Sequence, residues 1–222
     1  SPDGDEHLAR EGVPSTKIER VGNIMIDSFE LMAPKIRSAG MPAKLGLAKG
    51  EYGVVTLHRP SNVDDAAQLS SIVDKLVATA KRLPLVFPVH PRTRQRFKDF
   101  GLMPVLERTP AIKLTEPLSY IEFMSLVVDC RFALTDSGGV QEETSYLGIP
   151  CLTLRENTER PITVSLGTNR LVTVGSLQED VLRILAGPSR SQCAIPLWDG
   201  RTAPRVVASL ARHVGARSGQ PS

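Results

Sequence analysis

The sequence predicts an α/β fold in which helices cover both faces of a parallel sheet. Two observations predict this class. Short apolar runs rich in β-branched residues alternate with longer segments whose apolar residues recur at helical spacing. The short runs are apolar throughout, which is typical of strands buried on both faces by crossover helices. The composition, 41% hydrophobic and 23% charged over 222 residues, suffices for one large core.

The first fifty residues predict helices but little sheet. We expect a short helix over residues 5–11, which stops at Gly12-Val13-Pro14. A small apolar piece follows over residues 18–21 and ends at Gly22-Asn23. Residues 24–50 are interpreted as helix and linker, because prolines and glycines interrupt them repeatedly.

The regular alternation begins at Tyr52. The run 54–57 predicts a strand, and 69–80 predicts a helix because its apolar residues follow i, i+3, i+4 and i+7 spacing. Residues 85–89 predict the next strand, although Pro88 argues against pairing on both sides there. Residues 111–114 form a weaker strand candidate.

The second half continues the pattern. We expect helices and strands in turn, and a disordered tail because small and polar residues end the chain. The helices are expected at 120–128, 140–147, 177–185 and 204–214, the strands at 132–135, 151–154 and 170–174, and the tail at 215–222.

Composition excludes several classes of function. Lys+Arg minus Asp+Glu is 27 − 24 = +3, which is too small an excess for a nucleic-acid-binding protein. No apolar run approaches the roughly 18 residues of a membrane helix, and the start does not resemble a signal peptide. The chain does not begin with Met, so we expect a fragment or a processed chain. We expect it in the cytoplasm.

The cysteine and histidine patterns predict no metal site. Cys130, Cys151 and Cys193 are odd in number and far apart, so they indicate neither a disulfide framework nor a zinc site. The four histidines show no HxxxH spacing.

Polar residues follow four of the predicted strands. The segments after these strands are 58–59, 90–96, 136–139 and 155–160. Because ligands bind at the carboxyl ends of strands in an open parallel sheet, these segments predict one binding edge. The alternative is that they are ordinary solvated loop charges.

The sharpest feature is the turn Ser137-Gly138-Gly139, where a strand leads directly into a helix. Glycine allows a ligand to approach the backbone, and the first N–H groups of the helix attract an anion such as a diphosphate. Ser137 adds a hydroxyl donor, and Glu143 is suited to accept hydrogen bonds from a ribose diol. The alternative is an ordinary helix start with acidic residues near its amino end.

Four basic residues are further candidates. His58 is suited to proton transfer or to hydrogen-bonding a sugar, and Arg59 to holding a phosphate or a carboxylate. His90 is a similar but weaker candidate, and both histidines have the alternative of being ordinary loop residues. Arg160 is a candidate for an ion pair with Glu159 or for a phosphate contact. The arginines between residues 92 and 96 are interpreted as a solvated helix face.

Five motifs resemble the non-hydrolysing UDP-N-acetylglucosamine 2-epimerases. They occur in the same order as in the family and cover most of residues 50–175. The motifs are Val55-Thr56-Leu57-His58-Arg59-Pro60, Pro88-Val89-His90-Pro91, Leu118-Ser119-Tyr120-Ile121-Glu122-Phe123, the run from Thr135 to Glu143, and Leu154-Arg155-Glu156-Asn157-Thr158-Glu159-Arg160-Pro161.

The resemblance implies the C-terminal half of a GT-B enzyme, which has two Rossmann-like domains and an active site between them. Residues 1–27 would be a remnant of the first domain, ending with its last strand near 18–23. Residues 28–203 would form the UDP-binding Rossmann-like domain, and 204–214 the helix that crosses back. Most of the N-terminal half, which carries the family's acidic proton-transfer residues, would be absent.

The resemblance also implies roles for the candidate residues. Leu118, by its backbone, and Phe123 would line the uracil pocket, and Glu143 would bind the ribose. The diphosphate would lie on Ser137, Gly138, Gly139 and Arg160, and His58 would take part in catalysis. Arg59 and His90 are further candidates for binding the substrate. No cofactor, metal, membrane or nucleic acid is expected, and the family commonly forms homodimers, mostly through its first domain.

The implied reaction interconverts UDP-GlcNAc and UDP-ManNAc through elimination and re-addition of UDP. We expect this chain to bind UDP weakly and to be inactive alone. Two alternatives stay open at this stage: a GT-B glycosyltransferase that uses the same UDP-sugar donor, and a non-catalytic fragment that binds nucleotide sugars.

Overall fold

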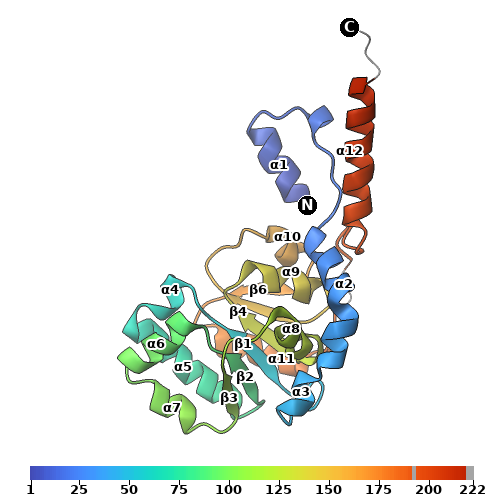
Figure 1. Cartoon of the computed structure of the whole chain (residues 1–222). Coiled ribbons are helices and arrows are strands. Elements are labelled where there is room, and N and C mark those ends of the chain that lie inside the picture. The colour runs from blue at the N-terminus through green and yellow to red at the C-terminus, as the bar shows by residue number, and fades with distance from the viewer. Residues whose placement is uncertain (192–193, 219–222) are drawn as a thin grey trace.

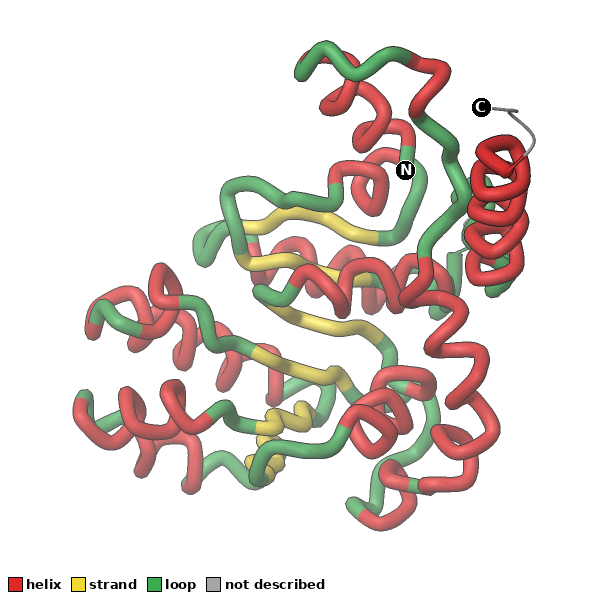
Figure 2. The backbone as a smooth tube through the Cα atoms, turned by 45° about the horizontal axis from the view of Figure 1, so that its top comes forward, coloured by secondary structure: helices red, strands yellow, loops and turns green. Residues whose placement is uncertain are grey.

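The computed structural model describes residues 1–191 and 194–218, so Cys193 and the last four residues of the predicted tail lie outside the described residues. Its centre is a six-stranded parallel sheet with the strand order β3-β2-β1-β4-β5-β6 (Figures 1 and 2). This confirms the predicted α/β class. The strands are β1 Gly53–Thr56, β2 Leu85–Pro88, β3 Ile112–Thr115, β4 Phe132–Thr135, β5 Cys151–Leu154 and β6 Asn169–Val172.

Helices make every connection between consecutive strands, as parallel pairing requires. The connecting helices are α4 Pro60–Val63, α5 Ala66–Ala80, α6 Pro91–Asp99, α7 Met103–Glu107, α8 Tyr120–Asp129, α9 Gly138–Tyr146 and α10 Pro161–Ser165. The helices outside the crossovers are α1 Pro2–Arg10, the short 3-10 helix η1 Ser15–Lys17, α2 Ile24–Ala39, α3 Met41–Lys44, α11 Leu177–Ala186 and α12 Thr202–Ser218.

Two apolar cores lie on opposite faces of the sheet. Val55 and Phe87 point to one face, where they pack with buried residues of α5 and α11. Their chain neighbours Val54 and Val86 point to the other face, where they pack with α2, α3 and α8. Successive side chains of a strand alternate between faces, so a strand covered on both sides must be apolar throughout. This is why the apolar runs predicted buried strands correctly.

Pro88 lies where the sequence predicts incomplete pairing. It pairs with Thr115 of β3, whereas the pairing of β1 with β2 is confined to Gly53–Leu85 and Val54–Val86. Proline has no backbone N–H, so it fits a strand only where no partner needs that donor. The shorter pairing of β1 with β2 meets this condition.

Two terminal predictions are wrong. The segment 18–23 is not a strand; it runs from η1 to α2 without a partner strand and passes beside α12, where the Glu19 carboxylate accepts a hydrogen bond from Ser209 and pairs with Arg212. The last helix does not end at Val214 but continues to Ser218. It also begins earlier than expected, because the Asp27 carboxylate accepts hydrogen bonds from the N–H groups of Thr202 and Ala203.

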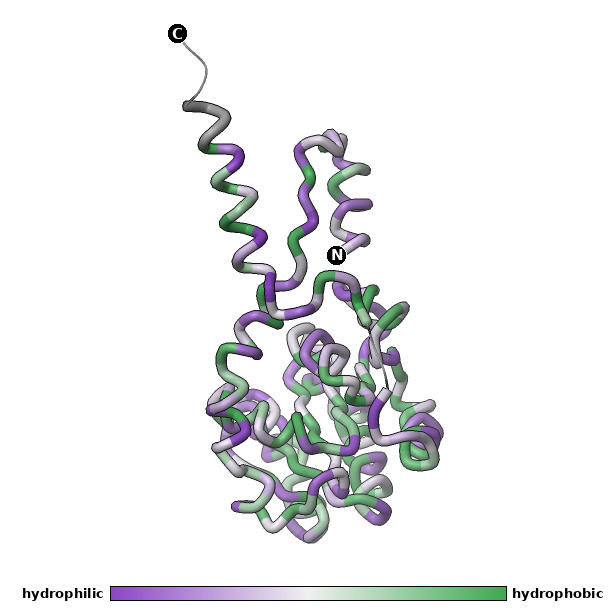
Figure 3. The backbone as a smooth tube through the Cα atoms, turned by 90° about the vertical axis from the view of Figure 1, so that its right-hand side faces the viewer, coloured by the Kyte–Doolittle hydropathy of each residue, from purple (hydrophilic) through white to green (hydrophobic). Residues whose placement is uncertain are grey.

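The N-terminal segment and α12 project together from the body that contains the sheet (Figures 1 and 3). Arg20 joins the segment 18–20 to α1 through Asp5, at 2.5 Å between Nη2 and Oδ2. Among the described residues, no helix is both long enough and apolar enough to cross a membrane.

Candidate functional site

The candidate site lies where the strand order reverses direction. From β1 the chain builds the sheet outward to β2 and β3, and it then returns to place β4 on the other side of β1. The loops after β1 and β4 therefore leave the same sheet edge in opposite directions, and this is the place where open parallel sheets bind their ligands. The segment 58–62 follows β1, and the segment 136–139 follows β4.

Asp136 joins the two loops. Its carboxylate is fully buried and accepts hydrogen bonds from the backbone N–H groups of His58 and Arg59, both at 2.9 Å, and from the Asn62 side-chain amide at 3.1 Å. The His58 imidazole adds a fourth contact, at 2.9 Å between Nδ1 and Oδ1. Burial would raise the pKa of Asp136, but these donors outweigh burial and lower it. Asp136 is therefore a buried anion.

Asp136 in turn orients His58 and favours its protonated form. The hydrogen bond to Asp136 raises the pKa of His58, and it outweighs the burial and the Arg59 charge that oppose it. Because Nδ1 is held by the carboxylate, Nε2 is the nitrogen left to act on a ligand. The side chain is 40% exposed, so a ligand can reach it.

His90 and Arg59 extend this corner. The ring of His90 lies 5.6 Å from that of His58, centroid to centroid, and its Nδ1 accepts a hydrogen bond from Arg92 N at the start of α6. Arg59 donates a hydrogen bond from Nε to the backbone carbonyl of Asp136 at 3.0 Å. Its Nη2 atom lies 3.7 Å from Oε1 of Glu159. Both predicted residues thus lie beside His58, and His90 also caps a helix.

Ser137, Gly138 and Gly139 form an open surface next to Asp136, here called the glycine shelf. Ser137 precedes α9 as its N-cap residue but makes no side-chain capping hydrogen bond, so its hydroxyl is not used to cap the helix. A Cβ atom placed on either glycine would meet no atom within 4 Å. The first N–H groups of the helix point into this space and favour an anion.

Glu143 follows one and a half turns into α9. Its side chain is buried, and its Oε1 atom has no hydrogen-bond partner. Burial raises the pKa of Glu143 to about 7, against a hydrogen bond from the Tyr120 hydroxyl that lowers it, and the charge of Glu142 adds to the increase. Tyr120 is the first residue of α8, so α8 and α9 meet at this carboxylate.

Leu118 and Phe123 flank the amino end of α8. Both are half-buried and pack against the core on the α2 and α8 face of the sheet. The Ser119 hydroxyl accepts a hydrogen bond from Glu122 N, and the Glu122 side chain accepts one from Ser119 N, which fixes this end of the helix. The predicted uracil-pocket residues thus begin the helix whose Tyr120 reaches Glu143.

Arg160 is engaged elsewhere. Its Nε atom lies 3.0 Å from the Glu142 carboxylate, which also accepts a hydrogen bond from the Asn23 amide at 2.9 Å. These residues line a cavity of about 260 Å³ between the N-terminal segment and α9. Arg160 therefore forms an ion pair, as one alternative predicts, but its partner is Glu142 and not Glu159. Glu159 instead pairs with Arg155, at 2.6 Å between Oε2 and Nη1.

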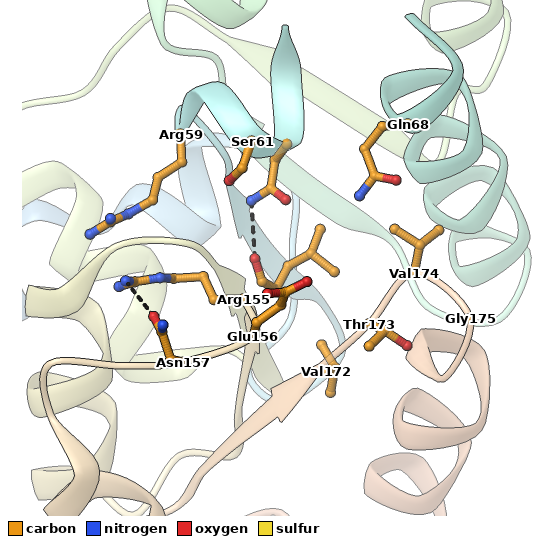
Figure 4. A pocket seen from close by; sticks show the side chains of 12 residues that line it. Arg59, Ser61, Gln68, Arg155, Glu156, Asn157, Val172, Thr173, Val174 and Gly175 are labelled. Carbon is orange, nitrogen blue, oxygen red and sulfur yellow. Dashed lines mark hydrogen bonds between the residues drawn. The ribbon is translucent and has the colours of Figure 1, made fainter. Parts of the chain in front are cut away.

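A larger cavity of about 500 Å³ adjoins the site beyond Arg59 (Figure 4). Its walls come from the loops after β1, β5 and β6 and from the start of α5. Arg59 and Arg155 extend in the same direction from facing walls, and Arg155 donates a hydrogen bond to Asn157 at 3.4 Å. Arg59 is the residue that this cavity shares with the predicted site.

Metal ligands do not gather anywhere in the described part of the chain: within residues 1–191 and 194–218, no three His, Cys, Asp or Glu side chains form a group that could hold a metal ion. Cys130 and Cys151 are buried free thiols, and burial raises the pKa of Cys130 to about 12 and that of Cys151 to about 11.

A family model described as UDP-N-acetylglucosamine 2-epimerase matches residues 1–211. The chain belongs to this family. It is 36% identical over 212 residues to the UDP-N-acetylglucosamine 2-epimerase of Methanocaldococcus jannaschii, a match that covers 92% of this chain and 57% of the relative. The chain thus spans little more than half the length of this relative.

Solved epimerase structures share the fold. The Methanocaldococcus jannaschii enzyme in complex with UDP-GlcNAc and UDP superposes with a TM-score of 0.80 at 35% identity, over 94% of this chain and 58% of that one. The Neisseria meningitidis enzyme bound to UDP-GlcNAc gives 0.82 at 26% identity, over 96% and 60%. The predicted fold, the Rossmann-like C-terminal domain of a GT-B fold, is confirmed.

Three residues of the site were missed as functional candidates. Asp136 lies inside a recognised motif, yet its role as the shared acceptor appears only when β1 and β4 are adjacent. An acidic residue at the end of a buried strand was the signal available. Asn62 and Tyr120 gave no such signal, since a helix-start Asn and a helix-start Tyr are ordinary choices.

Proposed function

We propose that this chain is the UDP-binding half of an enzyme that interconverts UDP-GlcNAc and UDP-ManNAc by epimerisation at C2. The observation that carries the proposal is the glycine shelf, which is open and lies directly beside the charged pair of His58 and Asp136. Membership of the epimerase family supports the same substrate class, since solved relatives hold UDP-GlcNAc or UDP.

The diphosphate would lie on the glycine shelf, where helix N–H groups and the Ser137 hydroxyl donate hydrogen bonds. His58 and Arg59 supply positive charge from the loop after β1. Arg160 is 46% exposed and pairs with Glu142, and a phosphate contact from it would require this ion pair to open or to be shared. These fixed donors and charges need no reorganisation when charge develops on the phosphates.

The remaining parts of the nucleotide follow from this placement. The uracil would lie near the Leu118 backbone and Phe123. The ribose would lie near Glu143, whose buried Oε1 atom has no hydrogen-bond partner. The sugar would face His58, with His90 beside it.

In the proposed reaction the proton at C2 is removed and the C1–O bond breaks, so that UDP leaves with the bonding electron pair and a 2-acetamidoglucal remains. Protonation of C2 from the other face and return of UDP to C1 complete the epimerisation. His58, whose protonated form Asp136 favours, would stabilise the leaving diphosphate and could donate a proton from Nε2. The groups that exchange the C2 proton would come from the part of the relatives' length that this chain does not span.

We propose that this other part is a first domain that packs against the projecting segments. In this division residues 1–27 belong to the first domain, 28–203 to the UDP-binding domain and 204–214 to the crossing helix. Val207 and Leu210 of α12 are 66% and 60% exposed, and these are apolar side chains that such packing would cover. We also propose that the complete protein forms a homodimer through the first domain and is cytoplasmic. Without the first domain, this chain should not catalyse the reaction.

Gly139→Ala tests the proposal. The new methyl group has room in the free protein, and the position lies within a helix, so the variant should unfold at the same temperature or a slightly higher one. The methyl group would occupy the space proposed for the diphosphate, so UDP affinity should fall at least about tenfold, or about 1.4 kcal/mol. Calorimetric titration with UDP measures the affinity, and thermal unfolding measures the stability.

Gly4→Ala is the matched control. Gly4 also lies in a helix, and its added Cβ would approach no atom closer than 3.9 Å, but it is in α1 and not on the shelf. This variant should bind UDP like the parent chain. If Gly139→Ala is folded and binds UDP with unchanged affinity, the diphosphate does not lie on the shelf and the proposal is wrong.

A further inference from the structure

Glu142 is a buried carboxylate at which two distant segments of the chain meet. Its Oε1 atom accepts a hydrogen bond from the Asn23 side-chain amide at 2.9 Å and lies 3.0 Å from Nε of Arg160. Asn23 is the N-cap residue of α2 and Arg160 that of α10, and α9, which carries Glu142, packs against both helices (Figure 1). One carboxylate oxygen thus joins the start of α2 to the start of α10.

The place of Glu142 on α9 brings its carboxylate toward the glycine shelf. Glu142 follows Gly138 by four residues, so the two lie on the same face of the helix. Side chains of a helix point back toward its amino end, and the Glu142 carboxylate therefore lies toward the turn that begins with Gly138. A Cβ atom on Gly138 would meet no atom within 4 Å, so the space over that turn is open. A guanidinium held by this carboxylate lies beside that space.

Arg160 keeps a donor for a ligand while it is held. Its Nε atom pairs with Glu142, and its Nη1 atom donates a hydrogen bond to the Glu159 carbonyl at 3.2 Å. Within the residues that the structure describes, its Nη2 atom donates no hydrogen bond, and the side chain is 46% exposed. A planar guanidinium that is fixed at two nitrogens presents the third in a defined direction. The ion pair with Glu142 can therefore be shared with a phosphate rather than broken.

We propose that Glu142 is a positioning residue, which Asn23 keeps in place and which holds Arg160 so that Nη2 binds the diphosphate. This inference rests on the proposed function, since it assumes that the diphosphate lies on the glycine shelf. The charge of Glu142 also repels a phosphate, and if repulsion dominated, removing the carboxylate would strengthen binding. Two donors share the Oε1 atom and disperse its charge, so we expect positioning to outweigh repulsion.

The experiment compares UDP with uridine by NMR titration of the full chain at one pH. Uridine has the same base and ribose but neither phosphate, so the affinity ratio of the two ligands isolates the contribution of the phosphates. A general change in the stability of the protein acts on both affinities and cancels in the ratio. The parent chain should prefer UDP by about tenfold or more, because hydrogen bonds to charged groups are the strong ones.

Variants of the ion pair test whether Glu142 acts through Arg160. Glu142→Ala should lower the ratio by about threefold to tenfold, because the guanidinium must then be ordered by the ligand. Glu142→Gln should keep the ratio within about twofold of the parent, because its amide oxygen can accept the same two hydrogen bonds. Arg160→Ala should lower the ratio by about tenfold, and adding Glu142→Ala to it should lower the ratio no further.

Arg160→Lys separates position from charge. Lysine keeps the positive charge but lacks Nε and the rigid fork, so the ratio should still fall by about threefold or more. Asp180→Ala is the matched control for Glu142→Ala. Asp180 is also buried and lies 2.8 Å from Nε of an arginine, Arg170, but it belongs to α11 and lines a different cavity. This variant should leave the ratio unchanged, whatever its effect on stability.

Each outcome decides one question. If the parent chain binds UDP no better than uridine, the proposed phosphate site fails and the inference fails with it. If the parent prefers UDP and Arg160→Ala keeps that preference, the inference is wrong while the glycine shelf stands. An unchanged or higher ratio in folded Glu142→Ala also overturns the inference, because the carboxylate then has no positioning effect or competes with the phosphates. If Glu142→Ala does not fold, Arg160→Lys decides, because a ratio like that of the parent would show that charge alone suffices.

Discussion

Two buried carboxylates lie on either side of the glycine shelf, and the protein treats them in opposite ways. Asp136 lies before the shelf and accepts hydrogen bonds from His58, Arg59 and Asn62, so its pKa is lowered. Glu143 lies after the shelf with one oxygen unpaired, and burial raises its pKa to about 7. Both are almost inaccessible to solvent.

The difference shows that partners, and not burial, determine what a buried acid does. Asp136 is an interior anion whose donors come from this chain, and it orients His58 and favours its protonated form. Glu143 keeps an oxygen, Oε1, that no described residue of this chain pairs with. The first acid is thus satisfied within the chain, whereas the second is the one that we propose meets the ligand.

The largest effect that separates the two carboxylates is expected from Asp136→Ala. The four groups that contact Asp136, among them the His58 ring, would lose their common acceptor inside the protein, so unfolding free energy should fall by about 3–5 kcal/mol near neutral pH. Urea unfolding measures this loss. Asp74→Ala, at an exposed position of α5, should change the same free energy by less than about 0.5 kcal/mol. A loss at Asp136 no larger than that of the control would remove the distinction drawn above.

Glu143→Gln should raise the unfolding free energy at high pH, which is the opposite of the change expected at Asp136. The folded protein holds the Glu143 proton up to about pH 7, whereas the unfolded chain releases it near the ordinary pKa of 4.5. The parent chain therefore loses stability as the pH rises between these values, by on the order of 3 kcal/mol in total. The glutamine variant lacks this loss.

The measurement is urea unfolding of both proteins from about pH 4 to about pH 8, where the variant should become progressively more stable relative to the parent. Glu107→Gln, at an exposed position of α7, is the control and should change stability by less than about 0.5 kcal/mol throughout. Parallel stability curves for the parent and Glu143→Gln would mean that Glu143 is charged in the folded protein, as Asp136 is.

His58→Gln should give the smallest change in unfolding free energy, measured by urea unfolding. Asp136 raises the pKa of His58, so this pair contributes stability that is fully present below the ordinary pKa of 6.5 and is lost as the pH rises through the folded value. Because His58 is 40% exposed, solvent screening keeps the contribution below about 1 kcal/mol.

NMR titration of the His58 ring checks the direction of this shift. The pKa should lie above 6.5 in the parent chain and fall toward it in Asp136→Asn. His7→Gln, at an exposed position of α1, is the control for the stability measurement. A His58 ring that titrates below 6.5 in the parent chain would contradict the assignment of Asp136 as its counter-ion.

Most strands and helices could be predicted because their signals are local. The run before His58 and the run before Asp136 are apolar at consecutive positions, and the helix after Asp65 repeats its apolar residues every three or four positions. The prediction of a strand at 18–23 was wrong because a strand requires a partner strand. A short apolar run does not specify whether a partner strand lies beside it. The end of α12 was predicted four residues too early, because Gly215 was interpreted as the end of the helix.

The sequence by itself determined the parallel sheet, the order of its motifs and the collection of His58, Ser137 and Gly138 at one sheet edge. These follow from local periodicity and from the rule that parallel strands end on the same side. Tertiary structure decided that Asp136 is satisfied, that Glu143 is not, and that Arg160 meets Glu142. Such pairings join residues as far apart as Asn23 and Glu142, 119 positions along the chain. Only the packing of the elements fixes the distances between them, and those distances set the hydrogen bonds and the ionisation of each acid.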